Sequence, residues 1–423
     1  MTRATSILVI RWLSPLLLAS GAQAQELTVE QLVATALERA PELQAARAEI
    51  AVVAGQVTQA ALRPNPMLAA SQEQGFGGMM ATNVGVEWPL DMFRRPARIA
   101  AAQSATEVTS LSIRDRERVL AATVREQAGR LLAAQRTLDV ITESLTAARR
   151  LRDLLDRRVT EGGTTKLDAN LAAVEAMRLE ADTALAAGDI AAALIELKAT
   201  VGLAPDAPLT VADSLEGLAA APAVPRLTPT AALEARPDLR EAIARIDFAD
   251  RRAAAARQEA RTDVTLAAGY TRSVFGFDQF GLTAGGSPTR IHDIFHMVTI
   301  GARISLPVRN RNEGTLAALE AERKGAEALF TARQRAARAE IDAAVARERD
   351  TRRAVELYAT TIRSLARQNV DVMLEAYDLG RFPLSDVLAE QRRYLDVEAG
   401  YTAVLTRAYE ARTAVARAFG EIP

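Results

Sequence analysis

The chain has 423 residues, of which 52 are basic and 53 acidic, and its formal net charge is −1. This balance gives no reason to expect nucleic acid as a partner or a polybasic contact with a membrane surface. The sequence has no cysteine and only two histidines, which excludes disulfides, thiolate metal sites and lipidation on cysteine. We therefore expect no enzyme, no cofactor and no resident metal.

Residues 1–24 are predicted to be a signal peptide. Arg3 and Arg11 provide a positive start, and residues 12–19 form an apolar stretch much shorter than the ~20 residues of a spanning helix. Residues 22–24 read Ala-Gln-Ala, the small-x-small pattern of a cleavage site. The mature chain is therefore expected to leave the cytoplasm. The alternative is an ordinary buried N-terminal helix.

The remaining sequence reads as a duplication, with halves at residues 25–215 and 216–423. Each half is expected to contain a helix, two strands, a very long helix, a turn and another helix. Three landmarks recur at a spacing of 218 residues, namely Gly162 with Gly380, Asp168 with Asp386, and Gly202 with Gly420. Residues 203–229, rich in proline, alanine and leucine, are predicted to link the halves.

Two segments are predicted to form unusually long helices. Residues 98–161 contain no proline and one glycine, and residues 326–379 contain neither. At about 1.5 Å per residue, these helices would run about 80–95 Å and would have to pack sideways against partners. Turns at residues 162–165 and 379–383 would fold each of them back into an antiparallel hairpin.

The predicted strands alternate between apolar and small or polar residues. The clearest example is Val264, Leu266, Ala268 and Tyr270, which alternate with Thr265, Ala267, Gly269 and Thr271. This period suits an outer-membrane barrel that is apolar toward lipid and polar toward its lumen. Residues 75–81 and 276–294 are expected to be outward loops, with Trp88 and Phe275, Phe277 and Phe280 as interfacial aromatics. The predicted lumen residues are Asn83, Glu87, Thr299, Arg303 and Ser305, with Arg303 and Glu87 able to pair.

Four strands cannot enclose a pore, and open strand edges cannot face lipid because their backbone groups would lack partners. Closure by several copies solves both problems, and three chains would supply twelve strands. The alternative is an ordinary half-buried antiparallel sheet.

Over nearly its whole mature length, the sequence resembles the TolC family of outer-membrane efflux proteins. Tyr377-x-x-Gly380, the LSDVL stretch at residues 384–388 and Gln391-Arg392 match the second periplasmic hairpin turn of that family. The stretch LPVRNRNEG at residues 306–314 resembles the strand-to-helix exit of its CzcC-like, heavy-metal branch.

The resemblance implies a mainly α fold with a membrane β-barrel. A homotrimer would form a twelve-stranded barrel in outer-membrane lipid and a long periplasmic helical barrel. Its partners would be a periplasmic adaptor and an inner-membrane RND-type pump. The expected function is a passive exit duct for heavy-metal cations. Alternatives are a duct for drugs or a secreted polypeptide and, in a different class, a periplasmic coiled-coil structural protein.

The resemblance also implies two sets of site residues. Gly162 and Gly380 would mark the hairpin tips that dock the adaptor, with apolar contact from Leu167, Leu379 and Leu384. Asp386 would form an acidic ring at the periplasmic gate, with Asp168 at the matching place. The alternative is that both acids only favour a helix N-terminus. The family's second acidic gate position is Ala389 here, and Phe382 stands where relatives carry a basic link.

His292 and His296 suggest a metal site because they are four residues apart. They fall, however, in a predicted loop that leads into a strand, where such residues lie roughly 13 Å apart. We favour a plain loop and strand over metal capture.

Overall fold

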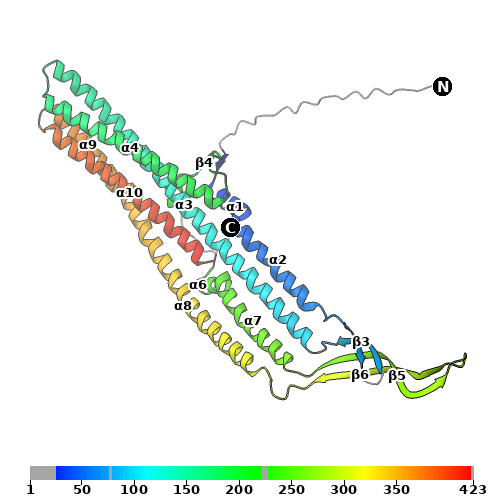
Figure 1. Ribbon diagram of the computed structural model, residues 1–423. Helices are drawn as coiled ribbons and strands as arrows, with labels where there is room; N and C mark the ends of the chain where they lie inside the picture. The colour runs from blue at the N-terminus through cyan, green and yellow to red at the C-terminus, as the bar shows by residue number, and fades with distance from the viewer. Residues whose placement is uncertain (1–24, 76–78, 222–226, 421–423) are drawn as a thin grey trace, which may run out of the picture.

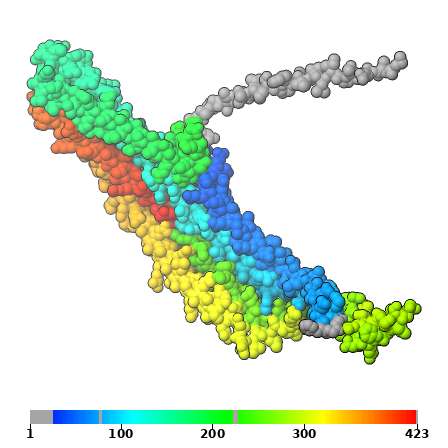
Figure 2. Space-filling view, in the orientation of Figure 1, coloured from blue at the N-terminus to red at the C-terminus, as the bar shows by residue number. Residues whose placement is uncertain are grey.

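The computed structural model describes residues 25–75, 79–221 and 227–420. The predicted signal peptide lies outside these described residues. The molecule is an elongated rod in which helices run along the length and a small sheet lies at one end (Figures 1 and 2).

Both halves contain the expected order of elements. The first half contains β1 (Gln25–Leu27), α1 (Val29–Arg39), α2 (Pro41–Ala61), β2 (Met67–Gln74), β3 (Met80–Pro89), α3 (Arg94–Thr160), α4 (Lys166–Val201), β4 (Leu209–Val211) and α5 (Leu215–Ala220). The second contains α6 (Pro229–Ala235), α7 (Pro237–Glu259), β5 (Asp263–Leu282), β6 (Pro288–Ser305), α8 (Glu313–Leu357), the π-helical turn η1 (Tyr358–Ile362), α9 (Arg363–Asp378) and α10 (Leu384–Ala418). The series α2–β2–β3–α3–α4 thus corresponds to α7–β5–β6–α8/α9–α10, and the predicted duplication is confirmed.

The second long helix differs from the prediction because η1 interrupts it. Tyr358, the first residue of η1, stacks on Tyr401 of α10 with ring centroids 6.1 Å apart. A Cβ added at Gly400 would lie 2.8 Å from the Tyr358 hydroxyl, so glycine is what lets this ring approach α10. The π-turn therefore lies where an aromatic side chain from the helix packs against its neighbour.

The predicted outward loop at residues 276–294 is wrong. β5 continues to Leu282 and β6 begins at Pro288, with a shift in register between Gly276 and Phe280. Gly276 lies at this irregularity, and a glycine within a strand often marks a bulge. The β5–β6 hairpin consequently projects beyond the rest of the sheet (Figure 2).

The core lies along α3, which packs against α4, α7, α2, α10 and α1. Small residues permit close approach between these helices. Gly129 of α3 is the clearest case, because a Cβ there would meet the ring of Tyr409 at 2.5 Å. At the end of α4, a strand pair adds to the core. β1 pairs in parallel with β4, and β4 lies within the segment predicted to be linker.

Gly202 is expected to be a position where alanine is not tolerated. It ends α4 with a φ of +82°, and an added Cβ would lie 2.7 Å from the carbonyl oxygen of Arg39. Left-handed backbone alone costs an alanine roughly 1–2 kcal/mol, and the contact with backbone adds to that cost. Gly202→Ala should therefore lower the free energy of unfolding by about 2 kcal/mol or more. Urea titration of the purified protein measures it.

Gly188 provides the matched control, because it lies within α4 and an added Cβ would meet nothing within 4 Å. Gly188→Ala should raise stability by roughly 0.5–1 kcal/mol, since alanine is the better helix former. Equal stability of the two variants would contradict the assigned role of Gly202.

Candidate functional site

The four longer strands form one antiparallel sheet in the order β2-β3-β5-β6, with β2 and β6 as its edges. The register places all five predicted lumen residues on one face, which we name the polar face. Arg303 lies opposite Thr265 of β5, and Glu87 lies opposite Ala267, two residues along the same strand. The predicted pair is confirmed, because Nη1 of Arg303 lies 2.8 Å from Oε2 of Glu87 across β5.

Asn83 extends the polar face toward β2 and β5. Its amide nitrogen donates to Ser71 and Glu73, and its amide oxygen accepts from Thr271 at 2.7 Å. The opposite face, which we name the apolar face, is exposed although it carries Val84, Trp88, Leu266, Tyr270, Val298, Ile300 and Ile304.

Charge is segregated between the two faces of the sheet. Among the described residues at paired positions, every acid lies on the polar face, namely Glu73, Glu87, Asp263 and Asp293. Two of the three arginines at these positions, Arg272 and Arg290, lie on the apolar face, together with His292 and His296. Arg303, the third arginine, lies on the polar face and is paired with Glu87. Sequence analysis missed this segregation because it ended the strands too early.

The two histidines lie within β6 rather than in the predicted loop, and they share the apolar face. Nδ1 of His296 lies 2.5 Å from the hydroxyl of Tyr270. In the described part of the chain, no group of three or more metal-ligating side chains is found. Nor is any described helix long and apolar enough to cross a membrane.

The two hairpin turns lie together at the end of the rod opposite the sheet (Figure 1). Gly162 ends the α3 side with a φ of +76°, and Gly380 ends the α9 side with a φ of +68°. Both glycines therefore adopt the left-handed backbone that their turns require, which is independent of any role in docking. An ion pair of 3.4 Å between Arg158 and Asp378 joins the hairpins near their tips.

One predicted docking residue needs correction. Leu384 is only 1% exposed and packs in a cluster with Leu155 and Val387, so it offers no apolar contact to a partner. It starts α10, and its side chain turns inward to join the two hairpins. Leu167 and Leu379 are 66% and 63% exposed, so these two leucines form the apolar surface of the tips.

The two predicted gate acids lie at helix starts. Asp168 accepts hydrogen bonds from Thr164 at 3.0 Å and from Thr165, the N-cap of α4, at 2.8 Å. Asp386 lies in the first turn of α10 and is exposed. The helix-terminus interpretation therefore describes the geometry of both acids, and the acidic ring stays a prediction.

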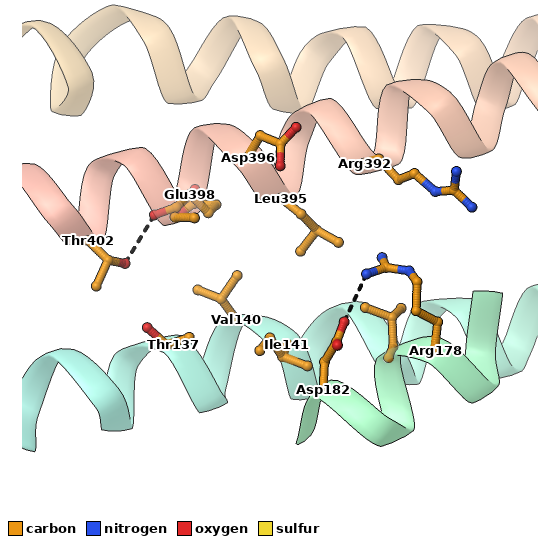
Figure 3. A pocket seen from close by; sticks show the side chains of 12 residues that line it. Thr137, Val140, Ile141, Arg178, Asp182, Arg392, Leu395, Asp396, Glu398 and Thr402 are labelled. Carbon is orange, nitrogen blue, oxygen red and sulfur yellow. Dashed lines mark hydrogen bonds and ion pairs between the residues drawn. The ribbon is translucent and has the colours of Figure 1, made fainter. Parts of the chain in front are cut away.

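Between the tips and the sheet, a cleft of about 490 Å³ separates α10 from α3 and α4 (Figure 3). Val140, Ile141 and Leu395 form its apolar part. Two buried carboxylates, which sequence analysis missed, lie around this cleft. Glu175 of α4 contacts Arg178 at 2.6 Å and Arg392 at 2.8 Å.

The second buried carboxylate, Glu398 of α10, contacts Arg136 of α3 at 2.8 Å and Arg363 of α9 at 2.7 Å. Both arginines also lie over the ring of Tyr401. Burial raises the pKa of Glu398, but the hydrogen bonds from Arg363 and Arg136 outweigh burial and hold the pKa below its usual range. Glu398 of α10 thus links this helix to α3 and α9 through two ion pairs.

Cysteine labelling is expected to separate the two faces, because the native chain has no cysteine. Arg303→Cys lies on the polar face and should react with a water-soluble maleimide in intact cells. Ile304→Cys lies on the apolar face, 54% exposed in the chain, and should react only with a lipid-soluble reagent. The reverse pattern would show that the faces are assigned wrongly.

Comparison with known proteins agrees with this architecture. The sequence matches the family described as outer membrane efflux protein over residues 32–203 and 228–421, one segment in each half. The cobalt-zinc-cadmium resistance protein CzcC of Cupriavidus metallidurans is 25% identical over 395 residues, covering 93% of this chain and 90% of CzcC.

Solved structures show the same fold. CusC superposes with a TM-score of 0.75 at 17% identity, over 93% of this chain and 92% of CusC. The outer membrane protein VceC of Vibrio cholerae gives a TM-score of 0.71 at 21% identity, over 93% of this chain and 96% of VceC. With both halves matched, the chain belongs to the outer membrane efflux protein family, and its helices and sheet are those of an outer-membrane efflux channel.

Proposed function

We propose that three copies of the chain form the exit duct of a tripartite efflux system for heavy-metal cations. The open edges of β2 and β6 and the exposed apolar face support the trimer. In lipid, unpaired strand edges are costly, and joining β6 of one copy to β2 of the next removes them. Twelve strands would then surround a lumen lined by the polar face.

The observation that carries the choice of cargo is the charge of the polar face. Each copy places four carboxylates there. Glu87 is paired with Arg303 and Asp263 with Arg94, whereas Glu73 and Asp293 form no ion pair among the described residues. Three copies would thus give a lumen of negative potential, set mainly by Glu73 and Asp293. Such a lumen attracts cations and repels anions, because field lines concentrate within a narrow low-dielectric wall.

The relative CzcC, by its name, confers resistance to cobalt, zinc and cadmium, which supports divalent metals as cargo. An inner-membrane RND-type pump would drive transport, and a periplasmic adaptor would join the pump to the hairpin tips. The duct itself would be passive. If Asp386 also formed a ring around the threefold axis, divalent cations would meet carboxylates at the periplasmic entrance as well.

Deletion of the gene tests the proposal. Loss of growth on cobalt, zinc or cadmium, with unchanged tolerance of lipophilic drugs, is expected and should be restored by the wild-type gene. Sensitivity to drugs with normal metal tolerance would favour a drug duct. Loss of a secreted polypeptide would favour the type I secretion alternative.

Variants of the polar face provide a sharper test on the purified protein. Glu73→Gln with Asp293→Asn removes two carboxylates per copy, neither of which forms an ion pair among the described residues. Single-channel recordings of purified trimer should show weaker cation selectivity. Gln72→Glu, on the apolar face, is the matched control and should leave selectivity unchanged. Unchanged selectivity in the first variant would remove the electrostatic argument for cations.

A further inference from the structure

Arg272 and Arg290 on the apolar face are not explained by a cation duct, because they point away from the proposed lumen. Arg272 of β5 lies directly opposite His296 of β6 and Thr82 of β3. Arg272 and Arg290 have no carboxylate partner in the described part of the chain, whereas most of its arginines form ion pairs. A face that otherwise carries mainly apolar side chains thus presents unpaired positive charge.

A neighbouring copy would not supply the missing negative charge. β5 is an internal strand, so β3 and β6 flank Arg272 on both sides in any closed assembly. Around Arg272, the apolar-face neighbours are Tyr270, Val274, Val84, Ile294 and Val298. β2, the edge that would meet β6, presents only Leu68, Ala70, Gln72 and Gln74 on this face. None of these side chains is acidic.

The position of Arg272 and His296 along their strands indicates their depth in the membrane. From Ile304 to His296 is eight residues of β6, or about 27 Å along the strand at ~3.4 Å per residue. With the ~40° tilt of membrane barrels, that length covers about 20 Å of depth, close to the far border of an apolar band about 25 Å tall. Tyr270 immediately precedes Arg272 on this face, as expected for an aromatic girdle at that border.

We propose that Arg272 and His296 bind the phosphate of a glycolipid headgroup in the outer leaflet, at three equivalent sites around the trimer. This inference rests on the membrane placement given by the proposed function. The Arg272 guanidinium can donate two hydrogen bonds to a phosphate. When the Tyr270 hydroxyl donates to Nδ1 of His296, Nε2 carries the proton and donates outward. Arg290, farther along β6 on the same face, extends the positive charge toward the sugars, and His292 offers a further hydrogen-bonding group there.

The acyl chains would lie on the apolar face below this site. Ala268, Ile300 and Val298 are exposed in the single chain and lie between the phosphate site and the periplasmic end of the sheet. A headgroup phosphate joined to these chains would contact charge and apolar surface at once. Inorganic phosphate, which lacks the chains, should therefore bind far more weakly than the lipid.

Native mass spectrometry of the purified, delipidated trimer tests the site. Bisphosphorylated lipid A should bind the wild type and, in the double variant Arg272→Gln/His296→Gln, should bind at least about tenfold more weakly, the loss expected for charge-assisted hydrogen bonds. Arg272→Lys should retain part of the binding. Arg303→Gln, which removes a cation from the polar face, should bind as the wild type does. Millimolar inorganic phosphate should not displace the lipid.

Two results would overturn the inference while leaving the proposed duct intact. One is equal lipid A binding by the wild type and by a double variant that is trimeric in the outer-membrane fraction. The other is an equal loss of binding in Arg303→Gln. If the wild-type chain is itself absent from the outer-membrane fraction, the membrane placement fails, and both proposals fail with it.

Discussion

Replacing Glu398 by alanine is expected to lower the free energy of unfolding by about 3 kcal/mol, because it leaves two arginines without their shared carboxylate inside the helical body. Glu398 is 2% exposed and contacts Arg136 and Arg363, which come from two other helices. Removing the shared carboxylate costs more than the pair itself contributes, because the Arg136 side chain is only 10% exposed and keeps Glu216 as its one carboxylate partner among the described residues. Urea titration of the purified protein at fixed concentration measures the loss.

The expected pH dependence of stability follows from the lowered pKa of Glu398. The pKa of Glu398 is held below its usual range in the folded protein, so its ionised form stabilises the fold above pH ~4.3, the value expected for an unfolded glutamate. That contribution is lost as the pH falls through the lowered folded-state pKa. The stability difference between the wild type and Glu398→Gln should therefore be constant near neutrality and shrink in acid.

Asp350→Ala is the matched control, because the Asp350 carboxylate is paired with Arg349 but is 70% exposed. An exposed pair of this kind contributes little, and the variant should remain within about 0.5 kcal/mol of the wild type. A similar loss in both variants would show that burial of Glu398 has no special effect.

The faces of the sheet were predictable from sequence, whereas most helix contacts were not. A strand alternates with period two, so Val298, Ile300 and Ile304 identify one face of β6 without any knowledge of its neighbours. For the same reason, the pairing of Arg303 with Glu87 could be expected. The hairpin turns at Gly162 and Gly380 could also be predicted, because both turns need a left-handed backbone, which favours glycine.

Helix faces were harder to assign because alanine occurs all around the long helices. In α3 and α4, alanine is often buried but also common at other positions, so no apolar stripe marks the packed side. The roles of Glu175 and Glu398 depend on which helix lies opposite, which a local pattern does not encode. Leu384 was misassigned for the same reason, since its burial requires the neighbouring hairpin.

The corrected view of the hairpin tips changes which leucines should matter for export. Leu167→Glu combined with Leu379→Glu should abolish metal export while trimer abundance stays normal. Both side chains are more than 60% exposed, so a carboxylate there costs the fold little. It would, however, introduce charge into the apolar surface that we propose contacts the adaptor, where an unpaired charge is costly. Cell-associated zinc in a deletion strain carrying the variant measures export.

Leu384→Glu should give the opposite pattern, with low abundance rather than a folded but inactive duct. Its carboxylate would enter the cluster formed with Leu155 and Val387, where no described arginine or lysine is part of the cluster. Burying such a charge costs several kcal/mol, enough to disrupt the joined hairpins. Leu167→Met with Leu379→Met retains the apolar tips and should export normally. Normal export from the double glutamate variant at normal abundance would mean that the adaptor docks elsewhere on the helices.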